Sequence, residues 1–337
     1  MSVVLVTSDR FADHLTPPGH PERVERAETM QVVTSRWRQQ GGEVVAPREA
    51  TEEDLLRVHG ANYVESLKAA RGRAGMLDAD TYLSPDSEEV ARFAAGAVLV
   101  AVDQVLDGSG RRAVVLVRPP GHHAETNRGM GFCLYNNIAV GAAWARTRGL
   151  SRVAIVDYDV HHGNGTQWMF YDDPTVLFVS SHQYPFYPGT GAAGETGKDA
   201  GVGYTVNFPL EAGATDADFD HVYSAAVIPL LQQFRPELVL VSAGFDAHER
   251  DPLGQMGVTT DGFGVLSTRL LRAADEQCDG RVIFVSEGGY DTQALAECCQ
   301  RVLTLCASES LPAPPSIEGD TRRGERSLAD FRRAHRR

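Results

Sequence analysis

The stretch "VDYDVHHGNGT", from Val156 to Thr166, places two aspartates, two histidines and an asparagine within eight positions. It continues directly from an apolar run at residues 153–156, which predicts a buried strand. Ionisable groups at the end of a buried strand lose solvation, and each unpaired charge there costs several kcal/mol or more. The sequence therefore indicates that this cluster is solvated, paired or bound to a metal ion.

Short runs rich in Val, Ile, Leu and Phe recur along the chain and predict the strands of a sheet. Their nearly continuous hydrophobicity is typical of parallel strands that are covered on both faces. The predicted strands are residues 3–6, 113–117, 153–156, 176–179, 238–241 and 282–285, with a further candidate at 204–208. Helical patterns lie between them at residues 88–106, 137–148, 219–233 and 261–276. This alternation predicts an α/β fold, which we expect to form one domain.

Polar motifs follow most of the predicted strands. Ligands of parallel α/β sheets bind beyond the carboxyl ends of the strands. The motifs are "RPPGHHAE" after Val117, "DYDVHHGN" after Val156, "SSHQYPFYPGTG" after Val179, "SAGFDAH" after Val241 and "SEGGYD" after Val285. We therefore expect these motifs to form one site at a single edge of the sheet.

Asp159 and His161 are candidate metal ligands. They are separated by one residue, so in an extended segment their side chains would point the same way, together with Asp157. Asp246 of "SAGFDAH" is the best candidate for a third ligand, because it too follows an apolar strand. Any one of these residues alone would more often be a helix cap or a structural histidine. Two carboxylates and one imidazole together suit zinc with one coordination position open to water.

His122, His123 and Tyr290 are candidate catalytic residues. The two histidines follow a strand and a Pro-Pro-Gly turn, which would carry them to the same rim as the proposed metal. Tyr290 follows two glycines, and a phenol with a pKa of about 10 stays protonated and can donate to an oxyanion. Adjacent histidines, or one tyrosine, would by themselves more often be structural, so the prediction depends on their shared location.

Composition limits the compartment and the partners. A formal net charge of −13 argues against general nucleic-acid binding, which needs a basic surface. No secretory signal is expected at the start, and no apolar run reaches the ~18 residues of a membrane span. The five cysteines show no CxxC spacing, which argues against a disulfide framework or a cysteine zinc site. We expect a cytoplasmic protein that binds neither membrane nor nucleic acid.

The composition changes near the carboxyl end. The segment "SLPAPPSIEGDTRRGERSLADFRRAHRR" contains three closely spaced prolines, followed by seven arginines after Thr321. We expect a domain at residues 1–310 and a C-terminal tail or terminal helix at 311–337 that packs on the acidic body. A contact with nucleic acid or a partner is the alternative function of the arginines.

Together, "RPPGHHA", "DYDVHHGNGTQ", "SAGFDAH" with "DPLGQM" behind it, and "SEGGYD" resemble the zinc-dependent histone deacetylase family, most closely its class II and bacterial members. The resemblance runs in order from "PPGHPERVERAETM" to "EGGYD", over most of the chain. It implies the arginase/deacetylase fold, a single α/β domain around an eight-stranded parallel sheet flanked by helices. It also implies a catalytic domain that hydrolyses an acetyl or related acyl amide, with an acyl-lysine protein or peptide as substrate.

The resemblance also implies roles for individual residues. The zinc ligands are Asp159, His161 and Asp246, with ferrous iron as an alternative metal. Asp157 orients His122, and Asn164 is the partner of His123. Because a neutral asparagine favours protonation less than a carboxylate does, His123 is expected to be the general base.

Two further sites follow from the same resemblance. A potassium ion is expected beside the zinc loop, held by Asp157, Asp159, His161 and Ser180. The acyl channel is expected to be lined by the residues of "GMGFC", "PFYPG" and "DPLGQM" that match the family's pocket, namely Gly131, Phe132, Tyr187 and Leu253. Taken alone, Phe132 would be a core residue and Tyr187 a loop aromatic.

There are three alternatives to an acyl-lysine deacetylase. Arginases share the fold but need more metal ligands than this sequence offers, and a non-catalytic binding module would lack the tyrosine. The third is an acetylpolyamine deacetylase acting on an acetylated small amine. Its family members carry a glutamate where this chain has Leu253, although Asp78, Asp80 or Glu125 offers another carboxylate. The sequence leaves the native substrate, acyl length and oligomeric state open.

Overall fold

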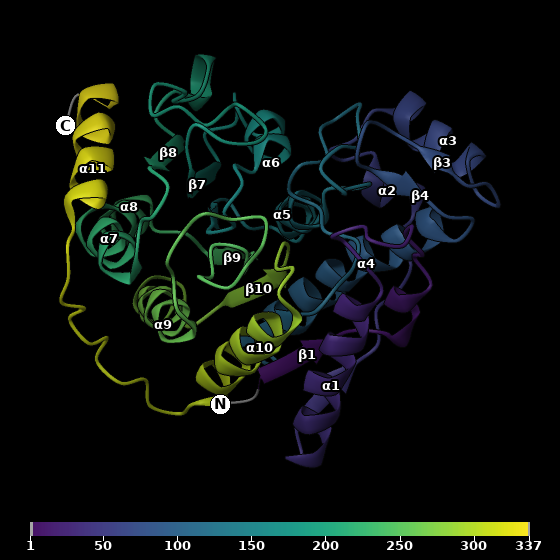
Figure 1. Cartoon of the computed structure of the whole chain (residues 1–337), viewed down its shortest axis with the longest axis horizontal. Helices are drawn as coiled ribbons and strands as arrows, with labels where there is room; N and C mark the ends of the chain where they lie inside the picture. Colours follow the sequence, from purple (N-terminus) through teal and green to yellow (C-terminus); the bar gives the residue numbers. More distant parts are fainter. Residues whose placement is uncertain (1–2, 336–337) are drawn as a thin grey trace.

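A parallel sheet of eight strands organises the structure, a computed structural model that describes residues 3–335 (Figure 1). Every strand pairs with its neighbours in parallel. In spatial order the strands are β2 (Glu43–Val45), β1 (Val3–Val6), β5 (Arg112–Val115), β10 (Val282–Ser286), β9 (Leu238–Ala243), β6 (Val153–Asp157), β7 (Val176–Gln183) and β8 (Thr205–Leu210). A separate antiparallel pair joins β3 (Gly75–Met76) to β4 (Tyr82–Leu83).

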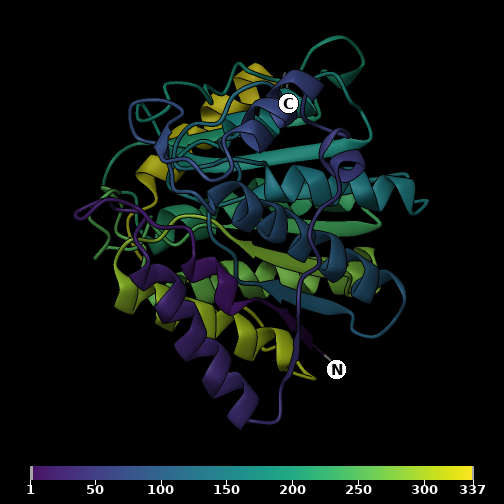
Figure 2. The ribbon, with the colours of Figure 1, turned by 90° about the vertical axis from the view of Figure 1, so that its right-hand side faces the viewer.

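Helices cover both faces of the sheet. One face packs against α1 (Glu25–Gln39), α7 (Asp216–Val222), α8 (Ile228–Phe234), α9 (Thr260–Gln277), α10 (Thr292–Ala307) and α11 (Arg322–Ala334). The other packs against α4 (Ser87–Leu106) and α5 (Asn137–Thr147), which cross in front of the strands in Figure 2. In β1, Val3 and Leu5 belong to the first core and Val4 and Val6 to the second. Burial on both sides explains the continuous hydrophobicity of the strands.

Smaller elements extend the second layer. The short helices α2 (Glu52–Leu55) and α3 (Ala61–Ala69) pack with α4 and α5 in a third apolar cluster. Helix α6 (Asn164–Met169) follows the loop after β6. Two 3₁₀ turns lie at Asp9–Ala12 and Asp199–Gly201, and a π-helical turn, Tyr223–Val227, joins α7 to α8.

The centre of the sheet defines where a site can form. Strands β5, β10, β9 and β6 are neighbours there although they come from distant parts of the chain. In Figure 2 the long loops gather on the left, at the ends towards which the strands run. The loops that follow these four strands therefore meet at one edge, as ligand sites of parallel sheets require.

The predicted α/β fold, the parallel sheet and the single domain are confirmed, with changes in detail. The strand predicted at 113–117 ends at Val115, whereas Asp157 is the last residue of β6. The helix predicted at 219–233 is two helices joined by the π-helical turn. Strand β2 was not predicted, because it is a half-exposed edge strand of three residues without a continuous apolar run.

Helix α11 packs back onto the body of the protein. Residues 308–321 have no helix or strand and run along the outside of the molecule (Figure 1). Leu328 and Phe331 are buried in the first core, where the ring centroids of Phe331 and Phe208 lie 5.1 Å apart. Arg326 pairs with Glu211 at 2.8 Å, so this arginine neutralises part of the acidic body. The division at residue 310 stays a prediction.

Two sequence-based expectations concern the compartment. None of the helices in the described part of the chain is long and apolar enough to cross a bilayer. All five cysteines are buried and free, so none forms a disulfide. The cytoplasmic location stays a prediction.

Phe331→Ala should lower the free energy of unfolding by about 3 kcal/mol, because it removes a buried ring that anchors α11. The measurement is urea denaturation of the full chain. Arg333→Ala is the matched control on the same helix, since its side chain is 75% exposed, and it should change stability by less than ~0.5 kcal/mol. Equal denaturation midpoints for the two variants would show that α11 does not stabilise the fold.

Candidate active site

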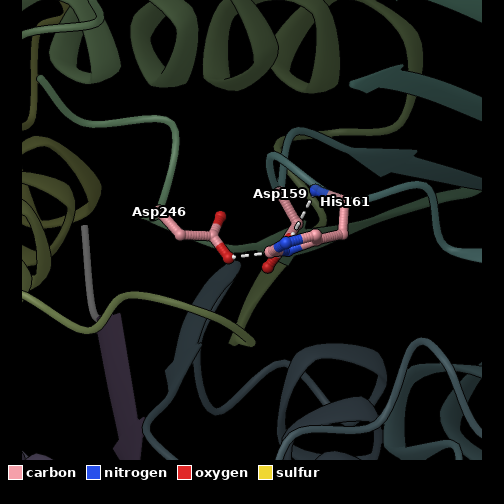
Figure 3. Close-up of side chains that lie close together, drawn as sticks. All are labelled: Asp159, His161 and Asp246. Atoms are coloured by element: carbon pink, nitrogen blue, oxygen red, sulfur yellow. Dashed lines mark hydrogen bonds and ion pairs between the residues drawn. The ribbon is translucent and has the colours of Figure 1, made fainter. Parts of the chain in front are cut away.

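Asp159, His161 and Asp246 converge at the carboxyl edge of the sheet (Figure 3). His161 Nδ1 lies 3.2 Å from Asp159 Oδ1 and 3.2 Å from Asp246 Oδ2. The three residues offer ligand atoms that all lie within 4.8 Å of one another. Asp159 and His161 follow β6 and Asp246 follows β9, so two adjacent central strands supply the group.

The loop after β6 is not extended, which corrects one step of the sequence analysis. The chain bends at residues 159–161, so the side chains do not converge by strand alternation. Instead, Asp157 Oδ1 accepts the backbone N–H of Asp159 at 3.0 Å, and Asp159 Oδ1 accepts that of His161 at 2.9 Å. Each aspartate thus accepts a hydrogen bond from the backbone N–H two residues further along and bends the chain there. Short acidic side chains favour such local hydrogen bonds.

The electrostatics of this group fit a cation. Asp159 and Asp246 are both fully buried. Burial and the nearby Asp159 raise the pKa of the Asp246 carboxyl above its usual value. Two buried carboxylates repel unless a positive charge compensates them, and a divalent ion with oxygen and nitrogen ligands provides that charge. The donor set therefore suits a metal ion.

Backbone groups complete the surroundings of the two carboxylates. Val160 N–H donates to Asp246 Oδ1, and Gly288 N–H donates to Asp159 Oδ2, each at 2.8 Å. A Cβ on Gly288 would lie 2.1 Å from Asp246 Oδ2, so only glycine allows this approach. The loop after β10 is thereby fixed against both aspartates.

His122 is held by a carboxylate beneath the site. Its Nδ1 lies 2.9 Å from Asp157 Oδ2, and its Nε2 lies 3.8 Å from Asp159 Oδ1. Burial alone would lower the pKa of the imidazole, but the charges of Asp159 and Asp157 raise it well above the usual histidine value. His122 is therefore the cationic member of the pair.

His123 has a different partner and the opposite shift. Its Nδ1 lies 2.8 Å from Asn164 Oδ1, in place of a carboxylate. Burial and the charge of the adjacent His122 lower the pKa of His123 well below the usual histidine value. The ring is therefore neutral at physiological pH, as a proton acceptor must be.

A cavity of about 230 Å³ opens onto this group. His123, His161 and Tyr290 line it, whereas His122 is not among its lining residues. The other lining residues are Asp80, Gly131, Phe132, Phe186, Tyr187 and Leu253. The structure thus brings all four predicted channel residues together around His123 and Tyr290.

Aromatic rings form the wall of the cavity. Tyr187 meets His123 edge to face, with ring centroids 5.2 Å apart, and Phe132 meets Tyr290 in the same way at 5.8 Å. Phe186 stacks on His161 with centroids 5.3 Å apart and an angle of 15° between the rings. This apolar wall suits the methylene chain of an extended substrate.

The backbone of "GMGFC" is unusual at the cavity. Phe132 has a φ of 69°. This left-handed conformation is unfavourable for residues other than glycine, and it recurs at functional sites. Gly131 has a φ of 56°, and a Cβ there would lie 2.5 Å from His123 Cδ2. This segment therefore approaches His123 closely and aims the Phe132 ring into the cavity.

Asp251 connects the tyrosine to the loop that carries Leu253. Its Oδ2 accepts the backbone N–H of Tyr290 at 2.6 Å and of Asp291 at 3.1 Å. Its Oδ1 accepts the N–H of Leu253 at 3.0 Å. Burial raises the pKa of the Tyr290 hydroxyl well above its usual value, so this hydroxyl keeps its proton and can donate it in a hydrogen bond.

Arg26 supports the same loop from behind. Its Nε donates to the carbonyl of Gly289 at 2.8 Å, and its Nη2 donates to that of Glu287. Its guanidinium lies 5.0 Å from the centroid of the Tyr290 ring. Glu22 balances the buried charge, since its Oε1 accepts from Arg26 at 2.7 Å.

Glu287 is a buried residue that the sequence analysis did not single out. Its Oε2 accepts the N–H groups of Gly121 at 2.6 Å and His122 at 3.1 Å, and its Oε1 accepts the Ser242 hydroxyl at 3.1 Å. It therefore fixes the turn that presents the two histidines. Its place in "SEGGYD" directly after an apolar strand was the available signal.

The sequence marks the other residues that support the site only weakly or not at all. Phe186 stands beside Tyr187 in the quoted "PFYPG", and Asp251 begins "DPLGQM". Arg26 lies within a helix, 263 residues before the glycine that it contacts, and no local pattern marks such a contact.

Several predicted or candidate residues are not among those that line the cavity, including the predicted potassium ligand Ser180. Ser180 pairs in register with Asp157 across β7 and β6, and its hydroxyl lies 2.9 Å from His182 Nδ1. Asp78 and Glu125 are not among the lining residues, whereas Asp80 is. Of the three alternative carboxylates, only Asp80 therefore faces the space that a substrate would enter.

Comparisons with known proteins agree with this arrangement. A family model described as "Histone deacetylase domain" matches residues 20–306. The chain is 39% identical over 292 residues to a probable deacetylase of Archaeoglobus fulgidus, covering 86% of this chain and 81% of that protein. It is 42% identical over 312 residues to the polyamine deacetylase HDAC10 of Homo sapiens, covering 87% of this chain but 45% of HDAC10.

A solved structure matches the whole fold. The crystal structure of the HDA15 HD domain aligns with a TM-score of 0.90 at 33% identity, covering 98% of this chain and 95% of that one. The arginase/deacetylase fold that the motifs implied is thereby confirmed. With a family model over most of its length and a structural match across the sheet and its loops, the chain belongs to the histone deacetylase family.

Proposed function

We propose that this protein is a zinc-dependent deacetylase that removes acetyl or related acyl groups from lysine side chains of proteins or peptides. The proposal depends on one observation: Asp159, His161 and Asp246 converge, and His161 lines a cavity together with His123 and Tyr290. A metal-ligand set, a neutral imidazole and a protonated phenol are the groups that metal-assisted amide hydrolysis requires.

The three ligands would hold zinc, with ferrous iron as the alternative ion. Two carboxylates and one imidazole leave a coordination position open, as in catalytic zinc sites. The bound ion would act as a Lewis acid on the amide carbonyl and on the attacking water. Membership of the histone deacetylase family supports this choice.

The protein's own residues would then move the protons. His123 accepts a proton from the attacking water, as its lowered pKa allows. The Tyr290 hydroxyl donates a hydrogen bond to the oxyanion that forms on the acyl carbon. When the C–N bond breaks, protonated His123 returns the proton to the leaving amine. Water and the acyl amide are thereby converted to a carboxylic acid and a free amine.

His122 and a potassium ion would stabilise the site without entering the cavity. Cationic His122, held by Asp157, adds positive charge beneath the reacting atoms. We place the potassium ion beside Asp157, Asp159, His161 and Ser180, where Asp157 and Ser180 are register neighbours on β6 and β7. Asp157, Asp159 and Ser180 are fully buried. Their burial supports a site in which oxygen atoms of the protein replace the water around a monovalent ion.

The substrate is proposed to enter between the aromatic rings. Phe132 and Tyr187 would flank the methylene chain of the acyl-lysine, and Leu253 would contact it at the rim. An acetylated polyamine is the second candidate, and the identity with HDAC10 together with Asp80 in the cavity wall favours it. Leu253 favours lysine, because it offers apolar contact and no charge for a distant ammonium.

Asp246→Ala should abolish tight metal binding together with activity, because it removes one anionic ligand of three. Metal content is measured on the purified variant by elemental analysis. Asp261→Ala is the control, since this side chain is 90% exposed, and it should keep about one metal ion per chain. Full metal occupancy in Asp246→Ala would refute the ligand assignment.

Tyr290→Phe should lower kcat on an acetyl-lysine peptide by ~10²- to 10³-fold, the usual effect of deleting one oxyanion donor. KM and the midpoint of unfolding should change little, because the ring is retained. Tyr204→Phe, at the residue directly before β8, controls for the loss of a hydroxyl elsewhere. An unchanged kcat in Tyr290→Phe would remove this hydroxyl from the mechanism.

Leu253→Glu should shift the ratio of kcat/KM values towards acetylpolyamine by roughly fivefold or more, since a carboxylate near a second ammonium contributes roughly 1 kcal/mol. Leu253→Gln is the matched control, because glutamine is polar and about the size of glutamate but carries no charge. The unmodified protein should prefer acetyl-lysine peptides. Faster hydrolysis of acetylspermidine or acetylputrescine by the unmodified protein would show that selectivity does not depend on Leu253.

A further inference from the structure

We propose that Glu125 is a positioning residue that fixes the amide of Asn164 and thereby sets which nitrogen of His123 carries the proton. This inference rests on the proposed function, since it explains how His123 is prepared to accept a proton. Glu125 does not line the cavity, so it would act on the reaction only through Asn164.

Three side chains form a continuous path from the cavity to the surface. Asn164 Oδ1 lies 2.8 Å from His123 Nδ1, and Asn164 Nδ2 donates to Glu125 Oε1 at 2.8 Å. His123 and Asn164 are buried, with 4% and 1% of their surfaces exposed, whereas the Glu125 side chain is 27% exposed. The backbone of Glu125 is itself anchored, because its N–H donates to the carbonyl of Arg128 at 2.8 Å.

The surroundings of Asn164 determine how its amide is turned. An amide has one end that donates and one that accepts, and the neighbours decide which end faces which. Glu125 Oε1 can only accept a hydrogen bond, so the NH₂ end of the Asn164 amide must face it. The other two groups near Nδ2, the His123 carbonyl and Met130 Sδ, each lie at 3.5 Å and are also acceptors.

This orientation controls the tautomer of His123. With its NH₂ end towards Glu125, Asn164 presents its oxygen to His123 Nδ1, which must then carry the proton. The lone pair of the neutral ring is left on Nε2, the nitrogen available to the cavity. A flipped amide would donate to Nδ1 and move the proton to Nε2, where it would block the general base.

The arrangement supplies orientation without placing a charge on His123. A carboxylate in contact with the ring, as Asp157 is with His122, raises the pKa of the imidazole. Here the neutral amide of Asn164 stands between the ring and the carboxylate. Arg128 Nη2 lies 3.3 Å from the same Glu125 oxygen and offsets part of its charge. His123 is thus oriented by an anion that it does not touch.

The decisive test is a double-mutant cycle on the zinc-loaded full chain. Glu125→Gln keeps the shape but lets the side-chain amide donate as well as accept, so the preference for one Asn164 orientation falls. We expect kcat on an acetyl-lysine peptide to decrease about tenfold, while KM stays within about twofold. Arg128→Gln is the control for a change of charge at the same surface, and should have a much smaller effect.

Asn164→Asp provides the second background. A carboxylate presents an oxygen to His123 in either orientation, so it needs no positioning by Glu125 and is repelled by it. In this background Glu125→Gln should leave kcat unchanged or raise it, instead of lowering it. An equal loss of kcat in both backgrounds would mean that Glu125 acts independently of Asn164 and would overturn the proposal.

Nitrogen-15 NMR of the histidine rings gives a readout that does not depend on turnover. In the unmodified protein, the His123 signals, assigned with a His123→Ala variant, should show a protonated Nδ1 and an unprotonated Nε2. In Glu125→Gln they should shift towards a mixture of tautomers, whereas an unchanged tautomer would contradict the proposal. A protein that hydrolyses no acyl-lysine or acetylpolyamine would refute the proposed function, and the NMR result would still decide the role of Glu125.

Discussion

The site depends on the burial of two like charges, Asp159 and Asp246, beside His161. Repulsion and lost solvation make this group costly, so the surrounding loops are built to compensate it. Backbone N–H groups of Val160 and Gly288 donate to the carboxylates from two different loops. The remaining charge calls for a cation, and this need explains why so many polar groups gather at the end of an apolar sheet.

Different partners give two adjacent histidines different properties. His122 contacts the carboxylate of Asp157 and has a raised pKa, whereas His123 contacts the amide of Asn164 and has a lowered one. The ring centroids are 4.1 Å apart, so a charge on His122 itself disfavours a second charge on His123. Two identical side chains next to each other in the sequence can therefore have different roles: His122 gives electrostatic support, and His123 transfers the proton.

Much of the fold could be predicted from the sequence, because buried parallel strands have a local signature. Strand β2 escaped prediction since an exposed edge strand needs no continuous apolar run. The site residues could be named from their motifs, but the reason for their convergence could not, because Asp157 and Asp159 bend the chain through bonds to its backbone. Arg26 and Glu287 act on partners far along the chain, a relation that no local pattern contains.

The proposed function requires one zinc ion among Asp159, His161 and Asp246, next to His123 and Tyr290. Anomalous diffraction from crystals of the unmodified protein, collected on both sides of the zinc absorption edge, tests it most directly. We expect a single strong peak about 2.0–2.2 Å from His161 Nδ1 and from one oxygen of each aspartate. A zinc-loaded crystal with no peak at these atoms, or with its peak at other residues, would refute this metal site.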